Sequence, residues 1–401
     1  MSAVTTAEVI KSDGCIITLH RVHGPDALEL FFNCQPDTDN AGPGQQAGSV
    51  YRAILATLEA EGGSFQSVVY ETVFLQNLEA DLDPVRAARD QVLAAVGQET
   101  HQPATSEIEQ PPLNQGAHLE VLIQAIIPHH ATLRSDTFKA QTACSCDECA
   151  RLHGLRVQVG DEARLYAGGL YGRGDDSYEQ THAMFTVAEN LLQQAGMDFG
   201  DVMRTWIYFP EMERDYAGFN RARREFFESR GVDPIPASTG IGAGLVPGEH
   251  DLLLGFYAVK GDIPTERTVM TTPTLNEAPV YGSDFSRGMR ILETNKIALH
   301  ISGTASLDEA GRTVHLDDFE AQADRMLVNV AALLKGQGAS FGDVVYAITY
   351  VKNPSDVRRL REKFRDAGYE GFPNVLVAAE VCRPELLCET EALAVLPRNT
   401  S

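Results

Sequence analysis

One domain-sized pattern occurs three times in this chain of 401 residues. Its most recognisable part is a Phe in a small polar turn, followed by a run rich in β-branched and aromatic residues, at residues 63–75, 197–209 and 339–351. Each copy follows a stretch with apolar residues at three- and four-residue intervals, the period of a helix, at residues 50–60, 178–194 and 318–335. The copies are roughly 130 to 140 residues apart, the size of a domain. The repeat therefore predicts one supersecondary unit used three times.

Each copy continues in the same way. A second helical stretch follows, at residues 83–95, 215–229 and 355–366, and the last strand-like run lies at residues 118–127, 251–259 and 386–396. The predicted unit is strand, strand, helix, strand, helix, strand, strand, which is an α+β sandwich with helices on one sheet face. The other face also has to be buried, and packing three sheets around a shared axis achieves this. We therefore predict an intramolecular pseudo-trimer with clefts between its units.

The repeats divide the chain into five segments. These are unit 1 (1–130), a cysteine-rich connection (131–160), unit 2 (161–262), a linker rich in Thr and Pro (263–280) and unit 3 (281–401). The composition of the linker predicts an extended connection.

The charge of the chain limits its partners. A formal net charge of −23 repels phosphate backbones and anionic membranes, so we expect neither nucleic acid nor membrane as a partner. A small anionic substrate would need a local group of arginines. No run approaches the roughly 18 apolar residues of a membrane helix, and the first residues lack a signal sequence, so we expect a cytoplasmic protein.

Two glutamates alternate in the last strand-like run. Glu389 and Glu391 fall on one face of an extended segment, while Cys388 and Thr390 fall on the other. One interpretation is an edge strand with both carboxylates in water. Apolar neighbours on both sides favour an interior strand, where something must offset the desolvation of a carboxylate. A carboxyl group whose pKa is raised by such a site can act as a general acid or base near neutral pH.

A cluster of soft ligands lies in the cysteine-rich connection. Cys144, Cys146, Cys149 and His153 offer four ligands within ten residues, enough for a structural zinc ion. Their spacing is not one of the common zinc motifs, so a reduced loop without metal is the alternative. No cofactor is required for the chemistry considered below.

The three units resemble the RidA (YjgF) family of small enamine and imine deaminases. Residues 301–304, followed by 321–323, are similar to the strand and first helix of that family, and residues 389–392 are similar to its terminal glutamate strand. Units 2 and 3 also resemble the chorismatases, a RidA-derived family. That likeness rests on residues 204–206, 236–243 and 381–389.

The resemblance implies a site between units 2 and 3. In chorismatases the glutamate that matches Glu389 protonates the enolpyruvyl side chain of chorismate, and pyruvate leaves. In RidA proteins the equivalent glutamate positions a water for imine hydrolysis. Both reactions need one carboxyl group and one fixed cation.

The chain also departs from the RidA pattern. The RidA arginine that holds the substrate carboxylate is replaced by Asn374 in unit 3, Ser238 in unit 2 and Thr105 in unit 1. We match Glu389 to Leu253 in unit 2 and to Leu122 in unit 1. Unit 1 is therefore degenerate, and one active site of a possible three is expected.

A substitute cation must come from elsewhere. Arg287 matches an arginine of the corresponding chorismatase strand and is our first candidate, because a guanidinium can hold a carboxylate bidentately. Arg204 is the second candidate, and a surface residue beside Asp201 is its alternative interpretation.

The remaining expected substrate contacts are Thr239, Gly240, Gly242, Ala243, Cys382 and Phe285. Residues 239–243 form a glycine-rich wall, where missing side chains let the backbone approach a ligand. A bulged strand without a ligand is the alternative, and Cys382 is alternatively a small buried hydrophobe.

The resemblance implies a chorismatase-like enzyme that cleaves pyruvate from chorismate or a related enolpyruvyl acid. A RidA-type deaminase with a relocated arginine is the second hypothesis, and a catalytically silent binding or scaffold protein is the third. An exposed Glu389 without an arginine in reach would favour the third. The expected assembly is a monomer with a pseudo-threefold core, or a dimer of such monomers.

Overall fold

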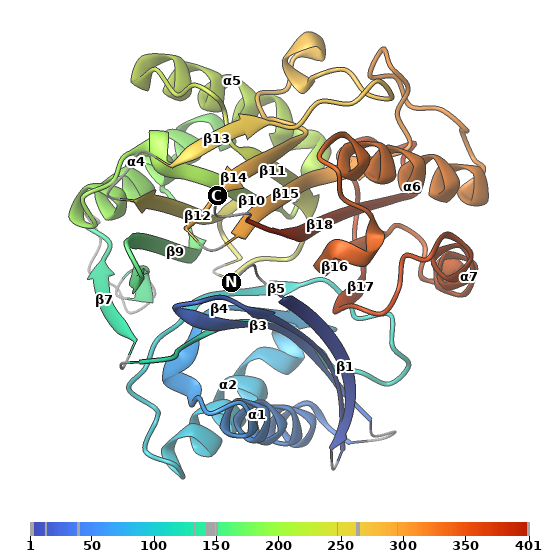
Figure 1. The fold of residues 1–401 in the computed structure, drawn as a ribbon. Coiled ribbons are helices and arrows are strands. Elements are labelled where there is room, and N and C mark those ends of the chain that lie inside the picture. Colours follow the sequence, from blue (N-terminus) through green and yellow to red (C-terminus); the bar gives the residue numbers. More distant parts are fainter. Residues whose placement is uncertain are drawn as a thin grey trace.

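The computed structural model describes residues 4–12, 14–37, 41–130, 133–141, 149, 151–246, 248–261, 265–294 and 296–398, without the side chains of residues 4, 280 and 281. Three units follow one another along the chain, each with a six-stranded sheet and helices that cover its outer face (Figure 1). The first unit contains β1 (Val4–Ser12), β2 (Cys15–His23), β3 (Ala27–Pro36), α1 (Pro43–Ala60), β4 (Val68–Leu75), α2 (Leu78–Ala94), β5 (Ala104–Glu109) and β6 (Leu119–Pro128).

The other two units repeat this order of elements. The second contains β7 (Arg134–Lys139), β8 (His153–Val159), β9 (Glu162–Leu170), α4 (Ser177–Gln194), β10 (Val202–Phe209), α5 (Met212–Arg230), β11 (Ala237–Gly242) and β12 (Leu253–Gly261). The third contains β13 (Glu266–Val269), β14 (Gly288–Leu292), β15 (Lys296–Ala305), α6 (Phe319–Gly336), β16 (Val344–Val351), α7 (Val357–Ala367), β17 (Asn374–Ala378) and β18 (Cys388–Pro397).

The three sheets have one topology. Their strand orders are β1-β2-β3-β6-β4-β5, β7-β8-β9-β12-β10-β11 and β13-β14-β15-β18-β16-β17. The last helical crossover of each unit joins two parallel strands, and the other neighbours are antiparallel. The predicted α+β class and the threefold repeat of one unit are confirmed.

Each unit begins with one strand more than the sequence predicted. β7 and β8 lie in the segment assigned to the connection, and β13 lies in the segment assigned to the linker; all three belong to sheets. Side chains of β7 and β13 are mostly exposed or half-buried, so these edge strands carry no alternating apolar pattern to reveal them.

The repeated turn before each central strand has a local cause. In the second unit, the Asp198 side chain accepts a hydrogen bond from the backbone N–H of Asp201. The Asp201 side chain in turn accepts one from the backbone N–H of Asp198. This reciprocal capping closes a single 3-10 turn and directs the chain into β10. The same arrangement precedes β4 with Ser64 and Ser67, and β16 with Ser340 and Asp343.

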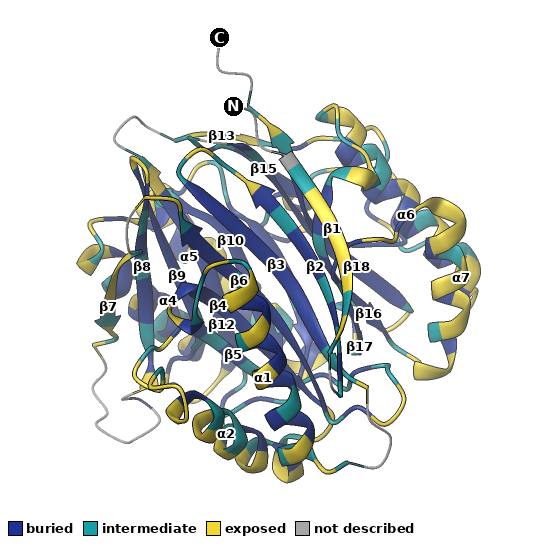
Figure 2. Ribbon diagram, turned by 60° about the horizontal axis from the view of Figure 1, so that its bottom comes forward, coloured by how far each residue is buried: buried dark blue, intermediate teal, exposed yellow. Residues whose placement is uncertain are grey.

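The inner faces of the three sheets meet around a common centre. Trp206 of the second unit stacks on Tyr70 of the first, with ring centroids 5.4 Å apart. Phe31 of the first unit stacks on Tyr346 of the third at 5.7 Å. These strands are buried, and exposed residues gather on the outer helix faces and on β1 (Figure 2). The inner sheet faces therefore bury one another, as the pseudo-trimer requires.

A buried ionic cluster also joins all three units. Arg164 in β9 lies 3.0 Å from Glu29 in β3 and 2.7 Å from Glu293, which precedes β15. Lys296 in β15 lies 2.5 Å from Glu29. Because removal of one partner would leave a buried charge uncompensated, this cluster fixes the three units relative to one another.

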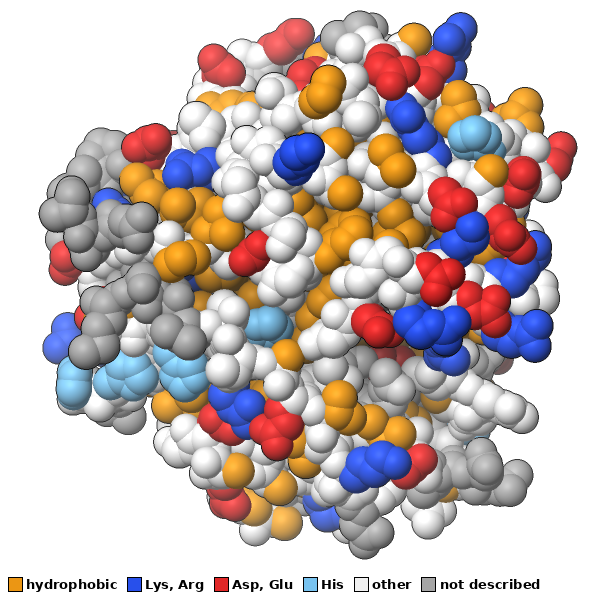
Figure 3. Space-filling model, turned by 45° about the vertical axis from the view of Figure 1, so that its right-hand side comes forward, with side chains coloured by type: hydrophobic (Ala, Val, Ile, Leu, Met, Phe, Trp, Pro, Cys, Tyr) orange, Lys and Arg blue, Asp and Glu red, His pale blue; other side chains and the backbone are white. Residues whose placement is uncertain are grey.

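On the face shown in Figure 3, Lys and Arg side chains lie among Asp and Glu side chains, and no basic patch forms among the described residues there. None of the helices in the described part of the chain is both long enough and apolar enough to span a bilayer.

Candidate functional site

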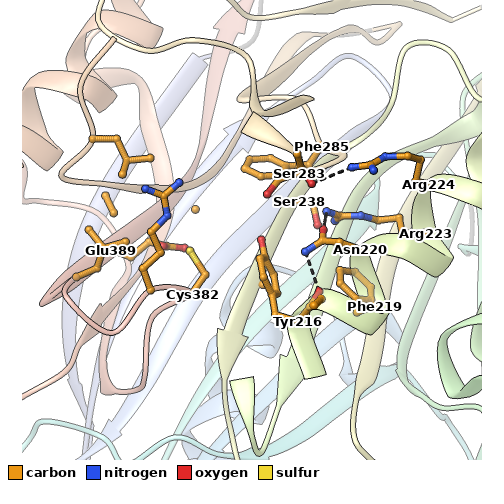
Figure 4. A pocket seen from close by; sticks show the side chains of 18 of the residues that line it. Tyr216, Phe219, Asn220, Arg223, Arg224, Ser238, Ser283, Phe285, Cys382 and Glu389 are labelled. Carbon is orange, nitrogen blue, oxygen red and sulfur yellow. Dashed lines mark hydrogen bonds between the residues drawn. The ribbon is translucent and has the colours of Figure 1, made fainter. Parts of the chain in front are cut away.

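A cavity of about 470 Å³ lies at the seam between units 2 and 3. Unit 2 contributes α5 and β11, and unit 3 contributes residues before β14, the end of β15, the loop before β18, and β18 itself. Glu389 and Cys382 lie on one side of the cavity, and Tyr216, Asn220 and Arg223 project from α5 on the other (Figure 4). The seam therefore brings together side chains far apart in the sequence.

Glu389 is the acidic group of this cavity. It lies in β18, where it pairs with Tyr350 in β16 and Ala305 in β15, and only 4 % of it is exposed. Burial and the negative charge of Glu391 together raise the pKa of Glu389 to about 8, against the opposing effects of Arg287 and Arg204. At neutral pH the carboxyl group is mostly protonated, so it can donate a proton.

Gly303 makes room for this carboxyl group. The pairing of β15 with β18 shifts between Ile301 and Thr304, which places Gly303 opposite the Glu389 side chain. A β-carbon at Gly303 would overlap with Oε1 of Glu389. Only glycine at this position allows the observed orientation of the carboxyl group.

Arg287 lines the same cavity as Glu389. It is 1 % exposed, its Nε donates to the carbonyl oxygen of Asn276 at 3.0 Å, and its guanidinium lies 5.4 Å from the ring centroid of Phe285. The structure thus brings Glu389, Arg287, Phe285 and Cys382 to one cavity.

Arg223 is a cavity residue that the sequence reasoning missed. It lies on α5, is 3 % exposed, and donates from Nη2 to Oδ1 of Asn220 at 2.6 Å. Its Nε has no hydrogen-bond partner among the described residues, and burial lowers its pKa. The signal lay in the helical spacing, because Tyr216, Asn220 and Arg223 share one face of α5.

Arg204 does not line the cavity, in contrast to the clamp role expected for it. Its Nη2 lies 2.9 Å from Oε2 of Glu391 and 2.5 Å from Oγ1 of Thr239. The alternative interpretation as a surface residue is also wrong, since Arg204 is 2 % exposed. Thr239 does not line the cavity, because side chains alternate along β11 and the cavity lies on the face of Ser238 and Gly240.

Gly242 and Ala243 belong to a different cavity. They line a second space of about 470 Å³ together with Glu380, and the backbone N–H of Gly242 donates to the carbonyl oxygen of Glu380 at 2.8 Å. The loop before β18 separates the two cavities, since residues 380 and 381 line one and residues 382 and 383 line the other. The glycine-rich segment thus continues past the site.

The register of the central strands corrects one match between the units. Glu389 pairs with Tyr350, the next-to-last residue of β16. The corresponding residues are Leu253 in unit 2, which pairs with Tyr208, and Glu120 in unit 1, which pairs with Phe74. Leu253 is confirmed, but Leu122 is wrong, because Leu122 corresponds to Glu391. Unit 1 therefore keeps the glutamate.

Glu120 lies in a seam that amide side chains fill. Asn33 Nδ2 donates to its Oε1 at 2.7 Å, and Asn114 Nδ2 donates to its Oε2 at 2.8 Å. Arg361 of α7 donates to Oδ1 of Asn114 at 2.8 Å. Burial raises the pKa of Glu120 to about 7, against these hydrogen bonds. Asn33 thus occupies the place that Gly303 leaves open in unit 3.

Replacing Glu120 by glutamine is expected to change the pH dependence of stability. The folded protein raises the pKa of Glu120 from 4.5 to about 7, so between these values it binds more protons than the unfolded chain. The free energy of unfolding of the wild type therefore falls as pH rises through this window. Between pH 4 and pH 8, the free energy of unfolding of Glu120→Gln should therefore rise by about 3 kcal/mol relative to that of wild type. Urea unfolding at both pH values measures this difference, and parallel pH dependences would contradict it.

The expected zinc ligands fall only partly within the structure. Cys144 and Cys146 lie outside the described residues. Cys149 is buried, with Sγ 3.4 Å from the Tyr171 hydroxyl. Both ring nitrogens of His153 lie near backbone oxygens, the closest being that of Arg151 at 2.7 Å. The described residues contain no group of three or more potential metal ligands.

Comparison with known proteins identifies the family. The family model described as endoribonuclease L-PSP matches residues 158–255 and 276–396. A 3-hydroxybenzoate synthase of Streptomyces hygroscopicus is 27% identical over 246 residues, which is 54% of this chain and 69% of that protein. A RutC family protein of Pyrococcus abyssi is 31% identical over 98 residues, which is 24% of this chain and 76% of that protein.

The fold has a solved counterpart. A crystal structure of a chorismatase is similar to this chain with a TM-score of 0.59 and 17% sequence identity, over 82% of this chain and 93% of that chain. The family model covers units 2 and 3, the two units that form the Glu389 seam. This protein therefore belongs to the endoribonuclease L-PSP family, also called the RidA or YjgF family, and has a chorismatase-like fold.

Proposed function

We propose that this protein is a chorismatase-like enzyme that releases pyruvate from chorismate or a related enolpyruvyl acid. The observation that carries the proposal is the position of Glu389, a buried carboxyl group with a raised pKa that lines a cavity with buried arginines. The similarity to a 3-hydroxybenzoate synthase over 246 residues supports the same reaction class.

The chemistry follows from the position of the proton. Glu389 donates its proton to the methylene carbon of the enolpyruvyl ether, and the positive charge develops on the carbon next to the ether oxygen. The carboxylate of the same group binds Arg287, which orients it. Water adds to the cationic carbon, and the resulting hemiketal collapses to pyruvate and the ring alcohol. The ionised Glu389 takes up the proton that the water releases, which restores the acid.

Arg223, the second buried arginine of the cavity, suits a substrate that carries a second anionic group. Arg223 and Arg287 come from different units and both line the cavity. Two buried guanidinium groups in one cavity wall favour an anionic ligand, because a bound anion offsets the cost of removing these charges from water. The Nε of Arg223 has no partner among the described residues and is available for such an anion. A volume of about 470 Å³ is in the range of small-molecule sites.

Imine or enamine hydrolysis is the second candidate, because the family model matches units 2 and 3 and the same carboxyl group would serve that reaction. Ser238 lines the cavity where RidA proteins have their arginine, which favours the first candidate. A silent scaffold would have an exposed Glu389, and here this residue is buried beside Arg287.

The test is product analysis with purified protein. We expect pyruvate from chorismate at neutral pH, and no ammonia from freshly generated 2-aminoacrylate beyond the uncatalysed rate. Ammonia without pyruvate would select imine hydrolysis, and neither product would remove both enzymatic candidates.

A further inference from the structure

Arg204 and Glu391 form a buried pair behind the wall of the cavity. They are 2 % and 1 % exposed, and neither lines the cavity. Besides Arg204, Glu391 accepts hydrogen bonds from Nε1 of Trp206 at 2.6 Å and from the Tyr350 hydroxyl at 3.2 Å. Buried ion pairs contribute little net stability compared with apolar side chains of similar volume. The pair therefore calls for an explanation beyond stability.

Hydrogen bonds lead from this pair to Gly303, which lies against the carboxyl group of Glu389. Nη2 of Arg204 also donates to Oγ1 of Thr239 at 2.5 Å. The same oxygen accepts the backbone N–H of Gly303 at 2.9 Å. Gly303 is the residue whose missing side chain leaves space for the Glu389 carboxyl group. The path leaves β18 in unit 3, crosses β10 and β11 in unit 2, and returns to β18 through β15.

The charged pair is specific to this seam. Among the equivalent residues, Tyr70 and Tyr346 stand in place of Arg204, and Leu122 and Gly255 stand in place of Glu391. In unit 1 the Tyr70 hydroxyl lies 3.2 Å from Oγ of Ser106, a neutral version of the contact between Arg204 and Thr239. Only the seam that contains Glu389 uses charges here.

We propose that Arg204 and Glu391 are positioning residues that act through Thr239 and Gly303 to hold the Glu389 carboxyl group in the orientation that protonates the substrate. This role rests on the function proposed above. It replaces the role of substrate clamp for Arg204, and it explains why a cation and an anion are both buried behind the wall.

The charges of the pair also act on Glu389 directly. Glu391 raises the pKa of Glu389 and Arg204 lowers it, so their effects oppose each other. The titratable groups that face Glu389 are Glu391, Arg204, Arg287, Tyr216, Tyr350, Cys382 and Cys388. Burial raises the pKa of both tyrosines and both thiols, so they are neutral near pH 7.

The first test changes Thr239, which carries no charge. Thr239→Val keeps the shape of the side chain and removes the oxygen shared by Arg204 and Gly303, whereas Thr239→Ser keeps that oxygen. Misplacement of a catalytic group slows the chemical step more than it weakens substrate binding. We therefore expect Thr239→Val to lower kcat by about 10- to 100-fold with KM nearly unchanged. Thr239→Ser should restore most of the activity. Equal kcat values for Thr239→Val, Thr239→Ser and wild type would overturn the proposal.

The second test needs no substrate and separates this proposal from the proposed function. The carbonyl stretch of protonated Glu389 is obtained from infrared difference spectra of Glu391→Gln with and without Glu389→Gln. Loss of the Glu391 charge, with Arg204 retained, should lower the titration midpoint of Glu389 by about one pH unit or more. An unchanged midpoint would overturn the direct action of the pair on Glu389, even if chorismate is a substrate. A shifted midpoint in a protein that releases no pyruvate would retain this action and reject only the proposed reaction.

Discussion

Replacing Glu389 by glutamine is expected to lower kcat for pyruvate release from chorismate by about 10³-fold, because the variant lacks the proton that the enolpyruvyl carbon must receive. Glutamine has nearly the same shape and can keep contacts with the cavity wall. Binding of the substrate should therefore change little, since its carboxylate is held by arginine. Steady-state kinetics with the released pyruvate as readout measures both parameters.

The chain itself offers a matched control. Glu120 occupies the equivalent position in unit 1, is also buried, and faces a seam filled by Asn33 and Asn114. Glu120→Gln should therefore keep the activity of wild type. Equal losses in the two variants would show that the loss reflects the fold, and full activity of Glu389→Gln would rule out Glu389 as the acid.

Replacing Gly303 by alanine is expected to lower kcat by about 100-fold, since the added methyl group would overlap with Oε1 of Glu389 and displace the carboxyl group. The backbone on both sides is fixed by the hydrogen bond from Gly303 to Thr239 and by pairing with β18. The side chain of Glu389 must therefore move instead of the strand.

A glycine of the same unit provides the control for this variant. A β-carbon at Gly342 would have only Oγ of Ser340 near it, at 3.6 Å, an ordinary contact. Gly342→Ala should therefore leave kcat unchanged. A crystal structure of Gly303→Ala should show a rotated Glu389 side chain. Wild-type kcat together with an unmoved carboxyl group would contradict the geometry described here.

The internal repeat was sufficient to predict the architecture. A capping turn and a central strand recur with recognisable residues, and apolar periodicity marks the helices that cover each sheet. The edge strands β7 and β13 were not predicted, because their mostly exposed side chains have no buried face that would impose an alternating pattern. The seam itself was predictable, since three sheets with apolar inner faces can bury them only against one another.

Assignments within the site were less accurate, and the reason is physical. The period of two in a strand determines which face a residue occupies, but Glu120 and Leu122 occupy the same face. Only the pairing with β4 separates them. Arg223 was missed and Arg204 was given the wrong role for a related reason, because whether an arginine lines a cavity or pairs with a carboxylate depends on residues of another unit.

The central claim is that Glu389 is protonated at neutral pH, and its carbonyl stretch tests this most directly. Infrared difference spectra of wild type minus Glu389→Gln, recorded across a pH titration, isolate this one carboxyl group. The account predicts loss of the protonated signal with a midpoint near pH 8. A midpoint near the ordinary glutamate value of 4.5 would contradict it.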